Sequence, residues 1–199
     1  MSEGDLFVEP EDATPLTKEE QQRIIPSWVT TRADLNVAEE DNILEGLQWA
    51  QKRRIKPADL ATEDFSKALH QKMLGKVWNW AGVYRRTDPN LGTDWWKVPT
   101  DCAALFGNFR YWIEHETYPP DELAVRLHHQ LVSIHPFPNG NGRHSRLMGD
   151  LLLESLGGQP FTWGGSGLIG EGELRRTYIT ALHEADRHNI APLLGFARS

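Results

Sequence analysis

The segment 135–146 combines a histidine, a glycine-rich loop and two arginines, and these residue types suit chemistry on a phosphate. It reads His-Pro-Phe-Pro-Asn-Gly-Asn-Gly-Arg-His-Ser-Arg. Gly140 and Gly142 flank Asn141, and glycine flexibility lets backbone N–H groups converge on an anion. His135 suits the role of a base towards a hydroxyl, because the pKa of histidine lies nearest to neutrality. The segment therefore predicts a phosphate site with a general base beside it.

Arg143 and Arg146 follow the glycines at a spacing of three, which places them on one face of a helix. The start of that helix adds favourable potential for an anion, and guanidinium forks match phosphate oxygens. Phosphoryl transfer depends mainly on positioning and charge neutralisation, and this arrangement offers both. On composition alone, an ordinary turn between helices, with solvated arginines and a packed His135, is an equal alternative.

Helices must position this loop, because apolar residues recur at spacings of three and four along most of the chain. The periodicity predicts helices near residues 43–50, 65–77, 100–113, 123–134, 147–156 and 174–185, with a last turn near 192–196. The exception lies between residues 82 and 99, where two short strands are expected to flank the turn-rich segment 88–92. We expect this hairpin to be a mobile flap, because a lone hairpin is marginally stable.

The bulk composition fits one mainly α-helical domain with an N-terminal arm. Of the 199 residues, 39% are hydrophobic and 25% charged, which permits a core without disulfides or structural metal. The net charge of −7 argues against general nucleic-acid binding, and no stretch approaches the length of a membrane span. Cys102 is the single cysteine, and the acidic N-terminus lacks the features of a signal peptide. We therefore expect a cytoplasmic protein.

The segment 135–146 resembles the Fic motif, HxFx(D/E)GNGRxxR, at every defining position except Asn139. Residues 80–85 are similar to the segment before the family's flap, and residues 177–182 to its late helix. The chain as a whole resembles a Fic subgroup called mobile mystery protein B. The resemblance implies a mainly α Fic-type (Fido) domain with a short β-hairpin flap and an N-terminal inhibitory helix. It divides the chain into an arm and inhibitory helix over 1–56 and a Fic core domain over 57–199.

This resemblance implies a protein adenylyltransferase, which moves AMP from ATP to a Ser, Thr or Tyr hydroxyl of a target protein with Mg²⁺ or Mn²⁺. His135 would take the proton from the hydroxyl, and Phe137 would anchor the loop. The residues implied to hold the phosphates are Gly140, Asn141, Gly142, Arg143 and Arg146. The flap implied to align the target by strand-like pairing comprises Leu91, Gly92, Thr93, Asp94, Trp95, Trp96 and Lys97. Expected partners are a protein substrate, the chain itself through self-modification, and a regulatory partner or a homodimer.

Asn139 stands where the family has Asp or Glu, whose carboxylate helps to hold Mg²⁺. Asparagine offers one neutral carbonyl oxygen, whereas a hard cation prefers charged oxygens. We therefore expect weaker metal binding, with nucleotide phosphates supplying most of the ligands. Two alternatives to AMP transfer follow: a non-catalytic nucleotide-binding regulator, or transfer or removal of a different nucleotide moiety. Deamidation of Asn139, which precedes Gly140, is a further hypothesis because it would produce the missing aspartate.

A second resemblance concerns the inhibitory helix that many Fic proteins carry, with the motif (S/T)xxxE(G/N). Glu45 and Gly46 match this motif, whereas Asp41 stands where Ser or Thr is expected. The resemblance implies that Glu45 pairs with Arg146 and so occupies the fork that a nucleotide needs. The alternative is a solvated glutamate on an acidic helix, because residues 39–41 are also acidic.

Overall fold

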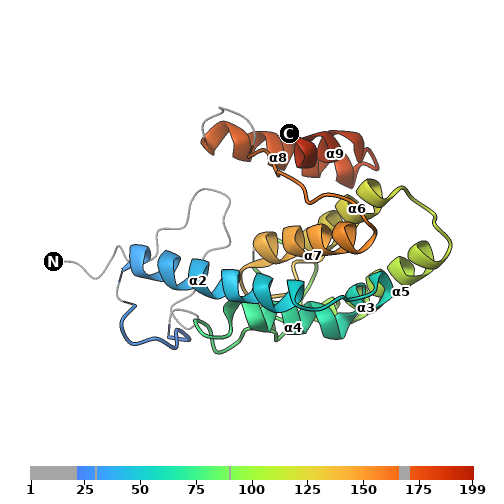
Figure 1. The fold of residues 1–199 in the computed structure, drawn as a ribbon. Helices are drawn as coiled ribbons and strands as arrows, with labels where there is room; N and C mark the ends of the chain where they lie inside the picture. Colours follow the sequence, from blue (N-terminus) through green and yellow to red (C-terminus); the bar gives the residue numbers. More distant parts are fainter. Residues whose placement is uncertain (1–21, 30, 90, 166–170) are drawn as a thin grey trace.

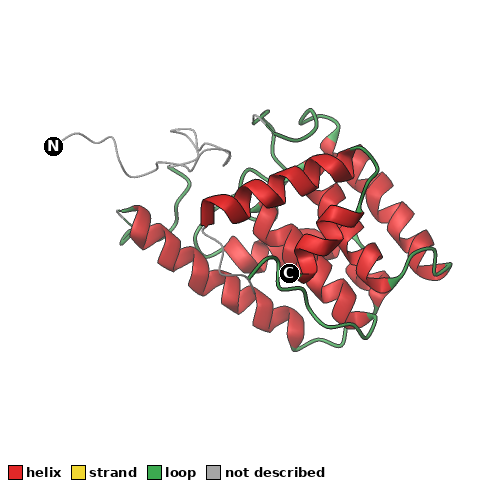
Figure 2. Ribbon diagram, turned by 90° about the horizontal axis from the view of Figure 1, so that it is seen from above, coloured by secondary structure: helices red, strands yellow, loops and turns green. Residues whose placement is uncertain are grey.

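The computed structural model describes residues 22–29, 31–89, 91–165 and 171–199, which fold into helices joined by loops (Figures 1 and 2). In chain order the helices are α2 (Arg32–Gln51), α3 (Pro57–Leu60), α4 (Glu63–Leu74), α5 (Val98–Glu114), α6 (Pro120–Ile134), α7 (Asn141–Ser155), α8 (Glu171–Asp186) and α9 (Ala191–Arg198). No strand occurs among these described residues, apart from an isolated antiparallel bridge between Ile24 and Trp78. The mainly α class is therefore confirmed.

The helices pack in pairs, with α6 against α7, α2 against α4, and α8 against α9. Figure 1 shows α6 and α7 in the middle, α8 and α9 on one side, and α2 and α4 on the other. A larger core cluster, which includes the fully buried Trp78 and Phe109, joins the middle pair to α2, α4 and α5. A smaller cluster around Leu153, Phe161 and Phe196 attaches α8 and α9 to the other side of the middle pair.

The turn between α6 and α7 depends on two residues with left-handed backbone. His135 caps α6 with φ 54°, and Gly140 caps the start of α7 with φ 76°. A side chain at Gly140 would be strained by that φ and would place its Cβ 2.5 Å from Leu74 Cδ1. The chain can therefore reverse within a few residues while its backbone lies against α4.

The inhibitory helix expected near residues 43–50 begins earlier, at Arg32. Thr31 and Asp34 form a capping box there, in which each side chain accepts a hydrogen bond from the other residue's backbone N–H, at 2.9 and 3.0 Å. The helix expected to begin at Thr100 also starts earlier, after Lys97, because Val98 and Pro99 form its first turn.

Where the hairpin was expected, residues 82–89 and 91–97 form a loop and residues 98 and 99 begin α5, so the prediction of strands was wrong there. The expected arm falls within residues 1–21, which lie outside the described residues, as does Asn90 in the expected turn. No helix among the described residues is long and apolar enough to cross a membrane. The boundary at residue 56 stays a prediction, and α2 shares the larger core cluster with α4.

Candidate active site

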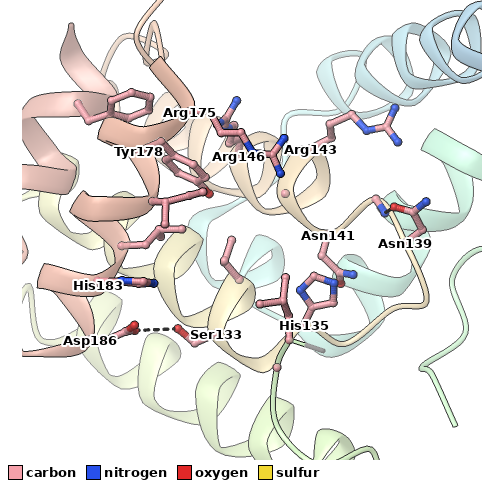
Figure 3. A pocket seen from close by; sticks show the side chains of 18 of the residues that line it. Ser133, His135, Asn139, Asn141, Arg143, Arg146, Arg175, Tyr178, His183 and Asp186 are labelled. Atoms are coloured by element: carbon pink, nitrogen blue, oxygen red, sulfur yellow. Dashed lines mark hydrogen bonds between the residues drawn. The ribbon is translucent and has the colours of Figure 1, made fainter. Parts of the chain in front are cut away.

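A cavity of about 860 Å³ lies beside the start of α7, within the usual size range of small-molecule sites. Its walls come from α6, the turn that follows it, α7 and α8 (Figure 3). The predicted site residues that line the cavity are His135, Asn139, Gly140, Asn141, Gly142, Arg143 and Arg146. Leu91 and Gly92 of the predicted flap also line it, whereas Glu45 and Gly46 do not.

His135 is 9% exposed and points its imidazole into the cavity (Figure 3). Burial, and secondly the nearby positive charge of Arg85, lower the pKa of His135 to about 4. The imidazole is therefore neutral near pH 7 and has a nitrogen lone pair to accept a proton. This is the protonation state that a general base requires.

Phe137 and Asn141 lock the turn between the two helices. Phe137 N donates to Asn141 Oδ1 at 2.9 Å, and Asn141 Nδ2 donates to Phe137 O at 2.8 Å. The Phe137 ring is fully buried and stacks on His70 at 3.7 Å between centroids. The Asn141 amide therefore shapes the turn, so that any contact of this residue with an anion falls to its backbone N–H.

His70 is a structural residue of the site that the sequence analysis missed. Gly82 N donates to His70 Nδ1 at 2.9 Å, so the proton of the neutral ring lies on Nε2, which donates to Asn139 O at 3.0 Å. Burial, followed by the proximity of His144, holds the pKa of His70 well below its usual value. The only sequence signal was a histidine inside the apolar face of α4, which predicts packing as readily as a role in the site.

Arg146 lies among aromatic rings at the cavity wall. Its guanidinium carbon is 4.6 Å from the ring centroid of Tyr178 and 5.7 Å from that of Trp163. Both rings are themselves fixed, because Tyr178 Oη lies 3.0 Å from His128 Nε2 and Trp163 Nε1 donates to Asp150 at 2.9 Å.

Arg175 of α8 lines the same cavity and lies beside Arg146 (Figure 3). It was missed because it falls outside the motif, on the helix that follows α7. With Arg143, three arginines of the described chain thus line one cavity. Such a concentration of guanidinium groups suits a polyphosphate, whose oxygens accept paired N–H donors.

Arg143 is ion-paired with Glu39 of α2, with Nη1 and Oε2 2.7 Å apart. Glu39 is 5% exposed and also accepts a hydrogen bond from Trp78 Nε1 at 2.7 Å. A buried carboxylate on α2 therefore already occupies one of the motif arginines. In the sequence, Glu39 is one of three consecutive acidic residues, and nothing there distinguishes it from a solvated one.

The expected pair between Glu45 and Arg146 is not formed. The Glu45 carboxylate instead lies 2.5 Å from Lys76 Nζ, and the two side chains are 51% and 69% exposed. Glu39 and Glu45 are six residues apart, about 240° around a helix, so they point to different sides of α2. Gly46 serves packing, since an added Cβ would lie 2.8 Å from Met73 Cγ and 2.9 Å from its Cα.

Asn139 does not complete a protein cage for a metal ion. Its Oδ1 accepts a hydrogen bond from Gly140 N at 2.6 Å. Within the described ranges of the chain, no group of three or more His, Cys, Asp or Glu side chains is placed to hold a metal. The side chains present thus do not fit a protein-held Mg²⁺, which prefers charged oxygens.

The flap loop, which we define as residues 86–89 and 91–97, lies against the end of α6. Thr93 N donates to Ile134 O at 3.3 Å, and Asp94 pairs with Lys97 at 2.7 Å. Gly92 has φ 96°, and an added Cβ there would lie 2.5 Å from His135 Cβ. Trp95 and Trp96 are 41% and 57% exposed and line a separate cavity of about 470 Å³. Their predicted part in target docking stays a prediction.

In its described residues the chain is a helical domain whose central turn carries a neutral histidine, backbone N–H groups and arginines, an arrangement whose chemistry suits an anion. Residues 57–153 match the model of the Fic/DOC family, so this part of the chain is a Fic domain. The finer assignment to the mobile mystery protein B subgroup stays a prediction.

The chain is 31% identical over 166 residues to a protein named Protein adenylyltransferase Fic from Drosophila grimshawi, which is 79% of this chain and 33% of that protein. The chain therefore spans about a third of the length of the curated relatives that it matches. Among solved structures, a Fic domain containing signaling protein from Bacteroides thetaiotaomicron gives a TM-score of 0.63 at 20% identity, covering 91% of this chain and 75% of that one. The BepC protein of Bartonella tribocorum, with bound AMPPNP, gives 0.62 at 17%, covering 92% and 97%. These structures share the fold.

Proposed function

We propose that this protein is an adenylyltransferase that moves AMP from ATP to a Ser, Thr or Tyr hydroxyl of a target protein. The observation that carries the proposal is the cavity in which the neutral His135 faces the start of α7 with Arg143 and Arg146. The name of the Drosophila relative and the AMPPNP bound to BepC support the same reaction. The chain itself is a further candidate target.

In this proposal His135 accepts the proton of the target hydroxyl, and the hydroxyl oxygen forms a bond to the α-phosphorus. The bond from that phosphorus to the oxygen bridging it to the β-phosphate breaks, and pyrophosphate leaves. Backbone N–H groups at the start of α7 hold the phosphates, and Arg143 and Arg146 neutralise their charge. Any Mg²⁺ or Mn²⁺ would be held mainly by the nucleotide's phosphates, given the neutral Asn139.

We also propose that Glu39 has the inhibitory role that the sequence analysis gave to Glu45. Its carboxylate holds Arg143, which the β-phosphate would otherwise engage. Its burial and its hydrogen bond from Trp78 fix it in that position. Removal of Glu39 frees Arg143, whereas removal of the half-exposed Glu45 frees only Lys76.

The test is incubation with Mg²⁺ or Mn²⁺ and ATP labelled at the α-phosphate, followed by measurement of label on the protein. We expect more label in Glu39→Gly than in wild type, wild-type label in the matched control Glu45→Gly, and none in His135→Ala. Label that rises in Glu45→Gly but not in Glu39→Gly would return the inhibitory role to Glu45. No label in any form, with ATP still bound, would contradict the transferase.

A non-catalytic nucleotide-binding regulator is the second candidate, and Asn139 is the residue that favours it. The variant Asn139→Asp separates the two, because it adds the carboxylate that a metal–nucleotide complex would use. Transfer by both forms supports the enzyme, and ATP binding without transfer by either form supports the regulator. The same assay with labelled UTP, CTP and GTP, and with AMP-modified protein, tests transfer or removal of another moiety.

A further inference from the structure

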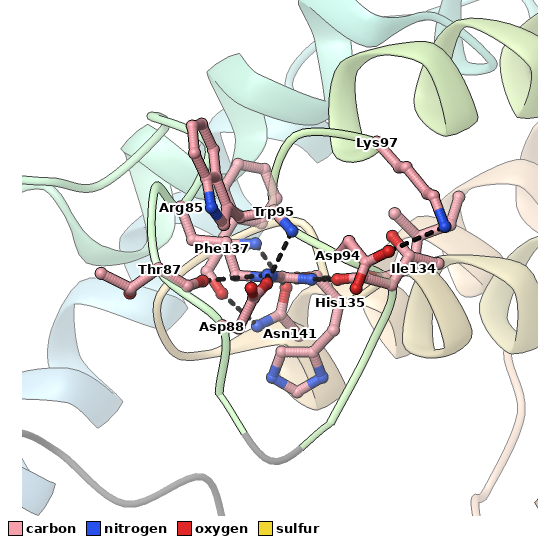
Figure 4. A network of polar contacts seen from close by, with 11 residues as sticks. Arg85, Thr87, Asp88, Asp94, Trp95, Lys97, Ile134, His135, Phe137 and Asn141 are labelled. Atoms are coloured by element: carbon pink, nitrogen blue, oxygen red, sulfur yellow. Dashed lines mark hydrogen bonds and ion pairs between the residues drawn. The ribbon is translucent and has the colours of Figure 1, made fainter.

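Arg85 is a buried cation where the flap loop meets the end of α6 (Figure 4). Its side chain is 1% exposed. Nε donates to the carbonyl oxygen of His135 at 2.6 Å, and Nη2 donates to that of Ile134 at 3.3 Å. Carbonyl groups at the end of a helix lack partners within the helix and carry partial negative charge. The guanidinium therefore supplies both hydrogen bonds and charge at the residue that bears the proposed base.

The same guanidinium also contacts two parts of the flap loop, residues 87–88 and residue 93. Nη1 donates to Thr87 O at 2.9 Å and lies 3.2 Å from Asp88 Oδ1, and Nη2 donates to Thr93 O. Asp88 Oδ1 also accepts from Trp95 N at 2.6 Å. Contacts on either side of the tip thus converge on one side chain (Figure 4).

We propose that Arg85 is the positioning residue of the site, because its guanidinium fixes the flap loop and the backbone of His135 relative to one another. This inference rests on the proposed transfer reaction, in which His135 is the base and the flap loop carries the target. His135 has a left-handed backbone, which non-glycine residues seldom adopt, and the bond from Arg85 Nε holds its carbonyl in that conformation. The imidazole of His135 is then already oriented when a target hydroxyl binds at the flap loop.

The number of donors explains why arginine is required. A guanidinium has five N–H hydrogens in one plane. The structure gives them five acceptors, which are the carbonyl oxygens of Thr87, Thr93, Ile134 and His135 and Oδ1 of Asp88. A lysine ammonium keeps the charge but has three hydrogens at a single point, so at least two acceptors would lose their donor. Arg85→Lys therefore removes the five-donor geometry of the guanidinium and keeps its positive charge.

The test compares Arg85→Lys with wild type and with Arg110→Lys, an exposed arginine of α5 as matched control. Amide hydrogen exchange at residues 91–97 reports the flap loop, and kcat and KM for ATP report the reaction. We expect faster exchange and a kcat lower by about 100-fold, the effect of a misplacement near 1 Å, while KM changes less than threefold. His135→Ala should lose kcat but keep the flap loop protected, and Arg110→Lys should match wild type.

Asp88→Ala provides a second variant in case Arg85→Lys does not fold, because Asp88 is 46% exposed. It removes one acceptor of Arg85 and the partner of Trp95 N, so exchange should rise and kcat should fall by a smaller factor. Wild-type exchange and kcat in a folded Arg85→Lys, or in Asp88→Ala, overturns the inference. If wild type transfers nothing, the proposed function fails, but hydrogen exchange still tests the link between Arg85 and the flap loop.

Discussion

At the scale of single residues, the protonation of His135 is the property that decides whether it can act as a base. Burial and the charge of Arg85 lower its pKa to about 4, and Arg143, Arg146, His183 and Asp186 share the cavity. We predict that Arg85→Met raises the pKa of His135, because one of the two lowering causes is removed. Arg85→Lys keeps the positive charge, so it should change the pKa less. An NMR titration of the His135 imidazole in both variants measures this.

The pKa of His135 also sets how the rate depends on pH. Because His135 is neutral above about pH 4, wild-type kcat should stay constant from pH 8 to pH 5 as far as this group determines it. In Arg85→Met the acid limb of the profile should move to higher pH. Identical titration of His135 in wild type and Arg85→Met would show that burial alone sets its pKa.

Gly92 is the second residue that should control the reaction. Its φ of 96° and the 2.5 Å that would separate an added Cβ from His135 Cβ leave no room for a side chain. We predict that Gly92→Ala lowers kcat by about 10- to 100-fold, since the flap loop or the imidazole must move by a fraction of an ångström or more. The measurement is kcat alongside calorimetric ATP affinity, which should change little. Unchanged kcat would show that the loop adapts without moving His135.

At the scale of elements, Gly46 allows α2 to approach α4. An added Cβ would meet the backbone of Met73, which cannot rotate away as a side chain can. We predict that Gly46→Ala destabilises the protein by about 1–3 kcal/mol and raises self-labelling, because α2 carries Glu39 away from Arg143. Thermal unfolding and the labelling assay check the two effects.

Gly107 of α5 supplies the control for that experiment, because a Cβ there meets nothing within 4 Å. Gly107→Ala should stabilise its helix by up to about 1 kcal/mol and leave labelling unchanged. Equal effects of the two alanine substitutions would mean that helix propensity, and not the α2–α4 contact, governs the result.

The helices were predictable because their apolar periodicity reflects burial on one face, as in α4 and α6. The flap loop was mistaken for strands, because short apolar runs in the sequence do not show that the Arg85 guanidinium holds this segment by its hydrogen bonds. In the sequence, Arg85 looks like any other charged residue, because its five acceptors come from segments up to 50 residues away. Glu39 was likewise hidden, since neighbouring acidic residues look alike until the face of α2 that packs on the core is known.

At the scale of the whole molecule, four buried histidines make acid the expected route to unfolding. Burial lowers the pKa of His135 and His144 to about 4 and holds those of His70 and His128 well below the usual value. Unfolded histidines take up a proton near pH 6.5, whereas the folded ones stay neutral, so stability is lost as pH falls from 6.5 towards 4. For a pKa of 4 the loss by pH 4 is about 3 kcal/mol per histidine.

We therefore predict a falling free energy of unfolding between pH 7 and pH 4.5, measured by urea titration at several pH values. His144→Gln should flatten the slope, because glutamine does not titrate and can donate to Ser66 O as the ring does. A free energy of unfolding that is constant over this range would mean that the folded and unfolded chains bind equal numbers of protons, and would contradict the lowered pKa values.

The left-handed, buried conformation of His135 has a consequence for entropy. A side chain that is free in solution must lose rotational freedom each time it aligns with a substrate. His135 loses that freedom when the chain folds, since its backbone is capped at the end of α6 and its surroundings are packed. The loss of entropy therefore lowers the stability of the fold once. The activation barrier of each turnover is lower, because the imidazole does not have to be ordered again.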